Sequence, residues 1–288
     1  MPTRDCCRMP LSRIPRLSMN QLSTYRWTID EDLFHYQRAG FAGIGVWRRK
    51  LSDFGVERSV ELLADSPMKV SNLLWAGGFT GNDGRSLEES VADATRAIEL
   101  AEAINAACLV VYTGGRNLHT RRHANRLVRS ALEDLLPVAE ARGVTLAIEP
   151  MHAACAGEWT LLTSLESARD LIDEYASERL KLVFDTYHFP DTPLDQAAEL
   201  APRTAVVHLA DIDSAHTVDQ DRRLPGEGRA PLADLVEAFV ANNFDGFFDV
   251  EVLGVAATTS DYAGMVRRSA RSGEKMLAAC VEPLPSLG

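Results

Sequence analysis

The feature that most constrains this chain is a repeated alternation of short, apolar, β-branched segments with longer segments of helical periodicity. Eight segments are predicted as strands, at 21–25, 43–47, 68–74, 108–112, 144–149, 180–185, 205–209 and 247–252. Each is followed by a predicted helix, at 30–39, 55–65, 86–106, 120–142, 164–176, 194–200, 231–243 and 261–281. Eight strand–helix units in about 265 residues are typical of an α/β protein built as a single (β/α)8 TIM barrel.

An open, doubly wound sheet is the alternative that also alternates strands and helices. That fold usually carries a glycine-rich turn after its first strand, whereas Tyr25-Arg-Trp-Thr contains no glycine. We therefore predict one barrel domain over residues 19–288. Residues 1–18 contain four arginines, three prolines and no apolar core, and are predicted to form a disordered N-terminal extension.

Composition excludes several classes of protein. The 30 Lys and Arg residues against 41 Asp and Glu residues give a net charge of −11, which disfavours a nucleic-acid partner. Apolar runs are too short for a membrane span. The five cysteines include no CxxC pair, so neither a disulfide framework nor a structural zinc site is indicated. A reducing, cytoplasmic location is the simplest expectation.

Four predicted strands close on an ionisable residue, and these four are the strongest functional signal. Strands five to eight end near Glu149, Asp185, His208 and Glu251. A barrel gathers the ends of its strands around one opening. Any one of these residues could cap a strand or pair with an arginine, but burying four together is very costly unless a cation lies between them. Three carboxylates and one imidazole suit Mn²⁺, Mg²⁺ or Co²⁺, and also Zn²⁺.

The segments LAIEPMH, VFDTYH, VVHLAD, RRLPGEG and DVEV occur in this order. Together they resemble the sugar phosphate isomerase/epimerase superfamily with the xylose-isomerase-like barrel. Within it, the ketose 3-epimerases, hydroxypyruvate isomerases and inosose dehydratases are most similar. The resemblance spans roughly residues 19–285.

This resemblance implies one bound divalent metal, with Mn²⁺ the first expectation, held by Glu149, Asp185, His208 and Glu251. It also implies a small sugar or keto-sugar substrate and a homo-oligomer, with room for a partner subunit. The residues that it places on the substrate are His188, Arg222 and, at a longer spacing than in the epimerases, Glu158.

Such a site suits removal of a proton from the carbon next to a carbonyl. Glu149 and Glu251 are predicted to be the two catalytic carboxylates because they lie on strands three positions apart around the ring. His152, three residues after Glu149, is an additional candidate for substrate binding or acid–base chemistry. Trp47 ends the second strand and either forms an apolar wall against the sugar or packs in the core.

Several functions remain open at this level. A metal-dependent isomerase or epimerase is the first expectation. The alternative is a lyase or dehydratase acting on a keto-cyclitol or 3-keto-glycoside, including elimination of the C-glycoside deglycosidase type. A non-catalytic sugar-binding scaffold is less favoured. A three-zinc abasic-site nuclease would need histidines where Trp75, Thr113 and Arg223 stand. Gly226-Glu-Gly228 also raises the alternative of a phosphate-binding loop.

Overall fold

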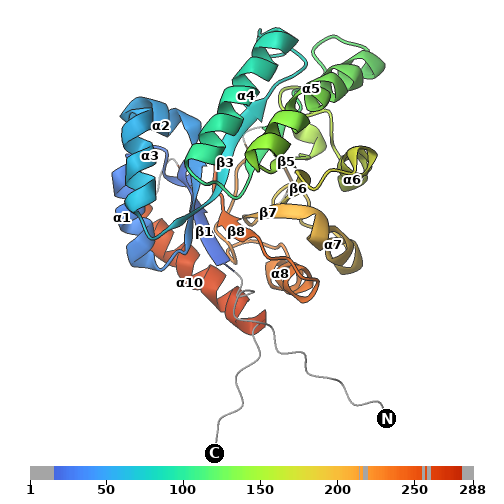
Figure 1. Cartoon of the computed structure of the whole chain (residues 1–288). Helices are drawn as coiled ribbons and strands as arrows, with labels where there is room; N and C mark the ends of the chain where they lie inside the picture. The colour runs from blue at the N-terminus through green and yellow to red at the C-terminus, as the bar shows by residue number, and fades with distance from the viewer. Residues whose placement is uncertain (1–15, 214, 217–219, 255–256, 258–260, 281–288) are drawn as a thin grey trace, which may run out of the picture.

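The computed structural model describes residues 16–213, 215–216, 220–254, 257 and 261–280. Within them, eight parallel strands form one closed barrel in which every strand pairs with its neighbours in sequence and β1 pairs with β8 (Figure 1). The strands are β1 (Arg16–Asn20), β2 (Gly43–Trp47), β3 (Lys69–Gly77), β4 (Leu109–Tyr112), β5 (Leu146–Ile148), β6 (Leu180–Asp185), β7 (Thr204–Leu209) and β8 (Phe247–Val250). The predicted TIM barrel is therefore confirmed.

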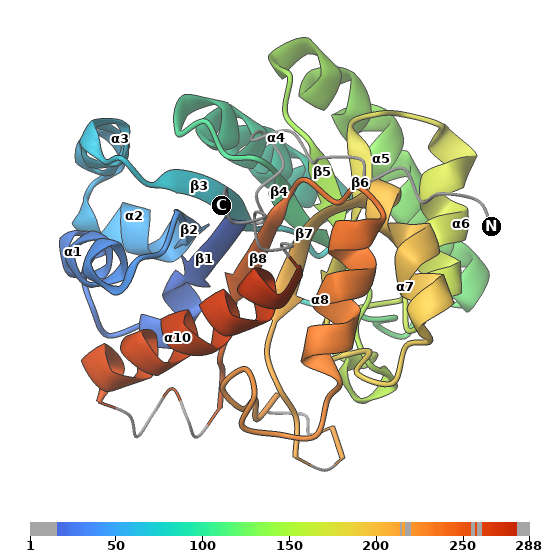
Figure 2. The same cartoon turned by 90° about the horizontal axis from the view of Figure 1, so that it is seen from below.

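The helices form a layer outside the ring of strands, as the two views of Figures 1 and 2 show. They are α1 (Ile29–Ala39), α2 (Arg48–Phe54), α3 (Val56–Asp65), α4 (Leu87–Ala103), α5 (Arg121–Arg142), α6 (Leu165–Tyr175), α7 (Leu194–Leu200), α8 (Leu232–Ala241) and α10 (Tyr262–Cys280). The C-terminal helix α10 packs against both α1 and α8 and so closes the outer layer. No helix in the described part of the chain is long and apolar enough to cross a membrane.

Local sequence signals fix several helix ends where they were expected. The side chain of Ser86 accepts a hydrogen bond from the backbone N–H of Glu89, and the Glu89 carboxylate accepts one from the backbone N–H of Ser86, which makes a capping box at the start of α4. Gly143 ends α5 in the left-handed conformation that glycine adopts without steric cost. The short helix α2 was not anticipated, because residues 48–54 lie directly after a strand.

The first strand lies earlier than predicted, and this corrects the predicted start of the barrel domain. Strand β1 covers Arg16–Asn20, so residues 16–18 belong to the barrel and not to an extension. The predicted strand at 21–25 is instead mostly a 3-10 helix, Gln21–Thr24. The strand was not predicted because two of its residues, Ser18 and Asn20, are polar. Both point into a polar part of the barrel interior, where they hydrogen-bond to Asp249. Residues 1–15 of the predicted extension lie outside the described residues.

Strand alternation decides which side chains enter the barrel. On β8 and just after it, Phe247, Asp249 and Glu251 are inward positions, while Phe248 and Val250 pack in the core between strands and helices. The same period of two places Val206 and His208 of β7 inside the barrel. Three predicted ligands, Glu149, Asp185 and His208, thus follow an inward apolar residue by two positions, whereas Glu251 follows the inward Asp249, and all four lie at or just after the carboxyl end of a strand.

Candidate metal centre

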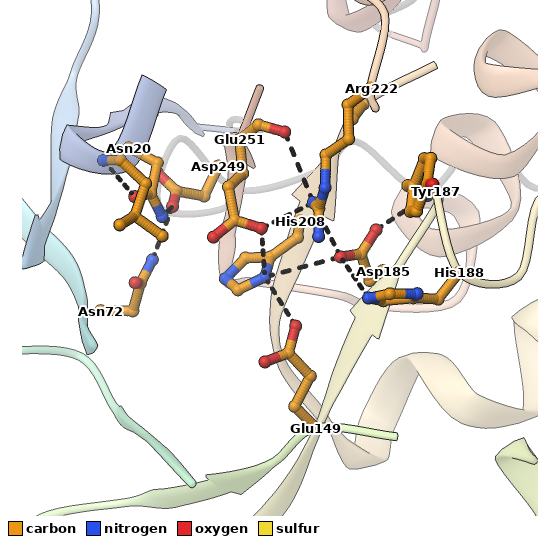
Figure 3. Close-up of polar contacts among 12 residues, drawn as sticks. Asn20, Asn72, Glu149, Asp185, Tyr187, His188, His208, Arg222, Asp249 and Glu251 are labelled. Atoms are coloured by element: carbon orange, nitrogen blue, oxygen red, sulfur yellow. Dashed lines mark hydrogen bonds and ion pairs between the residues drawn. The ribbon is translucent and has the colours of Figure 1, made fainter. Parts of the chain in front are cut away.

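Glu149, Asp185, His208 and Glu251 converge inside the carboxyl end of the barrel (Figure 3). All four are buried, and each offers one ligand atom within 4.8 Å of those of the other three. His208 Nδ1 is central to the group: it lies 3.2 Å from Glu149 Oε1, 3.4 Å from Glu251 Oε2 and 4.0 Å from Asp185 Oδ2. The structure therefore brings together all four residues that the sequence analysis selected as ligands.

The donor set fits a divalent cation. Metal–oxygen and metal–nitrogen bonds of about 2.0–2.6 Å place ligand atoms on opposite sides of an ion roughly 4–5 Å apart, which matches this spread. Asp185 Oδ2 accepts no hydrogen bond from the described residues, although it is completely buried. The Nη1 of Arg222 lies 2.9 Å from this oxygen without hydrogen-bond geometry, so Arg222 balances its charge, and no hydrogen bond to it has to break for a metal ion to bind.

The charges of these groups strongly perturb one another. Burial lowers the pKa of His208, but the carboxylates of Glu251 and Glu149 outweigh burial and raise it to about 10. Burial raises the pKa of Glu251 to about 7, against the opposing effect of Arg222 and His208. A cation bound among these groups would replace the imidazolium proton of His208, so metal binding must release protons.

Arg222 is buried against two of the four ligands. Its Nη1 donates to Glu251 Oε2 at 2.6 Å and lies 2.9 Å from Asp185 Oδ2 without hydrogen-bond geometry. The Tyr187 ring lies 5.0 Å from its guanidinium carbon. Burial opposes the charge of Arg222, but Asp185 and Glu251 raise its pKa further, so it stays cationic. The residue predicted to contact substrate oxygen thus belongs to the centre itself.

The segment Asp185-Thr-Tyr-His188 is locked by its own backbone contacts. Tyr187 N–H donates to Asp185 Oδ1 at 2.7 Å, which orients the carboxylate. The Thr186 hydroxyl donates to the carbonyl of Ala210 at 2.7 Å and so ties β6 to the end of β7. Both contacts fix the direction in which His188 leaves the strand.

His188 presents a single hydrogen-bond donor to the centre. Its Nδ1 accepts from the backbone N–H of His152 at 3.2 Å, so the ring hydrogen lies on Nε2. Nε2 has no hydrogen-bond partner among the described residues and lies 3.8 Å from Asp185 Oδ2. Burial lowers the pKa of His188 to about 3, so the ring is neutral. These contacts suit donation to a substrate oxygen and not proton abstraction.

His152 lies at the edge of this centre and has a partner that sequence reasoning missed. Its ring stacks on His216 of the β7–α8 loop, with ring centroids 3.6 Å apart and an interplanar angle of 10°. His216 Nε2 in turn donates to the carbonyl of Tyr187 at 2.6 Å. Burial, and then the proximity of His216, lower the pKa of His152. Because His216 lies in the loop between β7 and α8, no local sequence pattern predicts its contact with His152.

Trp47, for which the sequence left open a wall against the sugar or packing in the core, lies with two other tryptophans near the strand ends. Half-buried Trp47 and Trp75 pack against the apolar cluster inside the barrel. The backbone N–H of Trp47 donates to Gln21 at 2.8 Å, which holds the end of β2 against the end of β1. Trp159, from the loop after β5, lies beside Trp75 with ring centroids 5.8 Å apart. Because Trp159 lies in a loop, no local sequence pattern predicts this contact with Trp75.

Two further expectations concern loops. Glu158 is exposed, and its carboxylate makes none of the contacts that join the buried site residues; its backbone carbonyl accepts from Asn82 at 2.6 Å. The backbone N–H groups of Gly226 and Gly228 both donate to Asp211 Oδ2 at 3.0 Å. Because this carboxylate already occupies them, the two amides do not form the phosphate site considered from the sequence.

A further buried carboxylate, Asp249, lies deeper in the barrel and was not singled out from the sequence. Its Oδ2 accepts from Asn20 at 2.7 Å and Asn72 at 2.8 Å, and its Oδ1 accepts from Ser18 at 2.5 Å and Ser71 at 3.2 Å. Figure 3 shows this cluster beside the metal centre. Both oxygens are satisfied by neutral donors from β1 and β3, so Asp249 is a structural group.

Comparison with known proteins places this geometry in context. Residues 35–272 match the family model described as xylose isomerase-like TIM barrel. D-psicose 3-epimerase of Enterocloster bolteae is 31% identical over 121 residues, which are 42% of this chain and 37% of the epimerase. The chain therefore aligns with little more than a third of that relative's length.

Two solved structures share the fold. A Sinorhizobium meliloti protein superposes with a TM-score of 0.84 at 23% identity, covering 91% of this chain and 98% of its own. The IolI protein, whose structure holds a zinc atom, superposes with a TM-score of 0.80 at 17% identity, covering 93% of this chain and all of its own. The family match covers most of the barrel, including all four residues of the candidate metal centre: this chain is a member of the xylose isomerase-like TIM barrel family.

Proposed function

We propose that this protein is a divalent-metal-dependent sugar isomerase or epimerase that moves a proton on the carbon next to a carbonyl group. The observation that carries the proposal is the buried convergence of Glu149, Asp185, His208 and Glu251. The partial similarity to a D-psicose 3-epimerase supports a ketose as the substrate class. The zinc atom in the structure of IolI supports metal binding in this fold, while the carboxylate-rich donor set favours Mn²⁺ or Mg²⁺.

The chain's own residues supply the proton chemistry. Glu149 and Glu251 flank His208 Nδ1 from two strands, so two carboxylates face one point from different directions. In this arrangement one carboxylate can remove the proton while the other, in its protonated form, donates a proton to the opposite face of the same carbon, which inverts that carbon. Delivery of the removed proton by the first carboxylate to the neighbouring, former carbonyl carbon isomerises the sugar instead. The raised pKa of Glu251, about 7, lets this group gain and lose a proton near neutral pH.

Other residues orient the substrate. Arg222 and His188 direct N–H donors toward the centre, where a negative charge develops on the substrate oxygens as the proton leaves. The Trp47 and Trp75 rings border the apolar cluster inside the barrel and suit contact with the carbon face of a sugar. A divalent ion bound by the four ligands would polarise the substrate carbonyl as a Lewis acid.

A lyase or dehydratase acting on a keto-cyclitol or 3-keto-glycoside is the second candidate, and His152 favours it. This imidazole lies beside His188, is neutral because its pKa is lowered, and provides an additional acid or base for loss of a β-substituent.

Proton exchange with solvent tests both candidates. Metal-loaded protein is incubated in D₂O with D-psicose, L-ribulose, an inosose or a 3-keto-glucoside, and the sugars are followed by NMR. We expect deuterium to replace the hydrogen next to the carbonyl of a ketose, with an isomer or epimer as product and no exchange after chelation. An unsaturated or shortened product would select the lyase. Absence of exchange with every sugar, with metal bound, would contradict an enzymatic role and leave a binding scaffold.

A further inference from the structure

A cavity of about 520 Å³ borders the metal centre at the carboxyl end of the barrel. It is formed by the loops after β5, β6 and β7 together with the first turns of α6 and α7. Its volume lies within the range of about 300–1,000 Å³ that is usual for small-molecule sites. The four ligands themselves do not line it, so the cavity is separate from the place where the reacting atoms would lie.

His188 lies between the two spaces. It lines the cavity, yet its Nε2 lies 3.8 Å from Asp185 Oδ2 in the metal centre. Figure 3 shows this ring directly beside Asp185. The stacked rings of His152 and His216 also line the cavity, and the backbone N–H of His152 donates to His188. A molecule held by His188 at the metal centre therefore has this cavity as its neighbouring space.

The lining combines apolar rings with paired polar groups. Phe189, Pro190 and Pro193 supply apolar surface. At the rim, Arg229 donates to Asp191 at 3.0 Å, and Gln196 donates to Glu166 at 3.1 Å, which leaves further donor and acceptor positions on each side chain. Two carboxylates against one guanidinium do not favour an anion. Apolar surface edged by such pairs suits a neutral ring, either a second sugar or an aromatic group.

We propose that this cavity binds a second ring attached to the sugar that reacts at the metal centre. The preferred substrate is then a glycoside of the keto-sugar class, with a neutral sugar or aryl group joined to the reacting ring. This inference rests on the proposed function, because it takes the metal centre as the place of reaction.

Binding of two unreactive glycosides tests the inference without requiring turnover. Phenyl β-D-glucoside and methyl β-D-glucoside share the sugar ring and lack a carbonyl, so calorimetric titration of metal-loaded protein reports binding alone. Burial of the phenyl ring predicts about tenfold tighter binding of the phenyl compound. Ala215→Trp, which adds bulk at an exposed position on the cavity wall, and Phe189→Ala, which removes apolar lining, should each abolish that advantage.

Ala107→Trp is the matched control, because Ala107 is exposed and precedes β4 at the opposite end of the barrel. It should keep the wild-type preference. Equal affinity for both glycosides in the wild type, no saturable binding of either, or a preference kept in both cavity variants would overturn the inference. The proposed function fails separately: a clear phenyl preference without any deuterium exchange would leave the cavity assignment standing and remove the catalytic one.

Discussion

Two buried carboxylates that enter the barrel from the end of β8 have opposite surroundings. Asp249 is surrounded by neutral donors, and both of its oxygens accept hydrogen bonds. Glu251, two residues later, shares its space with two other carboxylates, the His208 imidazole and the Arg222 guanidinium. A carboxylate surrounded by neutral donors holds strands together, whereas one placed among charged and titratable groups remains available for a cation and for proton transfer.

The largest expected difference between the metal centre and the cluster around Asp249 is in their effect on enzymatic activity. Glu149→Gln removes a metal ligand and a proton acceptor with little change in shape, and we expect turnover to fall by about 10²–10⁴-fold. Asp249→Asn should leave turnover of the same sugar close to wild type. Steady-state kinetics with saturating metal, and circular dichroism to verify folding, measure the contrast. Equal losses in the two variants would show that the clusters act as one unit.

Metal removal should affect only one cluster. A cation at 100 times its dissociation constant stabilises the native state by about 2.7 kcal/mol. Chelation should therefore lower the melting temperature of the wild type and of Asp249→Asn alike, and added Mn²⁺ should restore it. Glu149→Gln should show a much smaller response. Elemental analysis of each protein gives the metal content, and a wild type without metal or melting shift would refute the metal centre.

The free energy of unfolding should instead depend more on the cluster around Asp249 than on the metal centre. Asp249→Asn places an amide donor against the donors of Asn20 and Asn72, and should lower the free energy of unfolding by about 1–3 kcal/mol. Urea denaturation measures this loss. Asp245→Asn is the control, because the same change is made at an exposed position just before β8. A loss no larger than that of the control would contradict the structural role of Asp249.

The neutral ring of His188 predicts the smallest effect, a dependence of stability on pH. Its pKa is about 3 in the folded protein, because the ring is buried, and about 6.5 in an unfolded chain. Between these values the unfolded chain binds one more proton, so the free energy of unfolding falls as the pH falls, by about 1.4 kcal/mol per pH unit. His188→Gln should lack this contribution. Urea titrations of both proteins at pH 5.5 and 4.5, where the unfolded histidine is almost fully protonated, compare the slopes, and identical slopes would contradict the lowered pKa of His188.

Much of the site could be predicted because its ligands share a simple rule of position. Asp185 is the last residue of β6, and His208 is the penultimate residue of β7. Glu149 and Glu251 directly follow β5 and β8. Residues on loops could not be predicted from their position relative to a strand end. His216 and Trp159 join the site region through loop conformations, whereas Glu158, expected there, is exposed. Loop paths depend on contacts between distant segments, which no local periodicity encodes.

The sequence by itself determined the barrel and the four converging ligands, because strand alternation and parallel topology bring every strand end to one opening. Only the tertiary structure decided which buried acid is structural. Asp249 and Glu251 stand two residues apart in one short segment, and their types differ by a single methylene. The donors that saturate Asp249 come from β1 and β3, more than 170 residues away in sequence, and only closure of the barrel brings them to it.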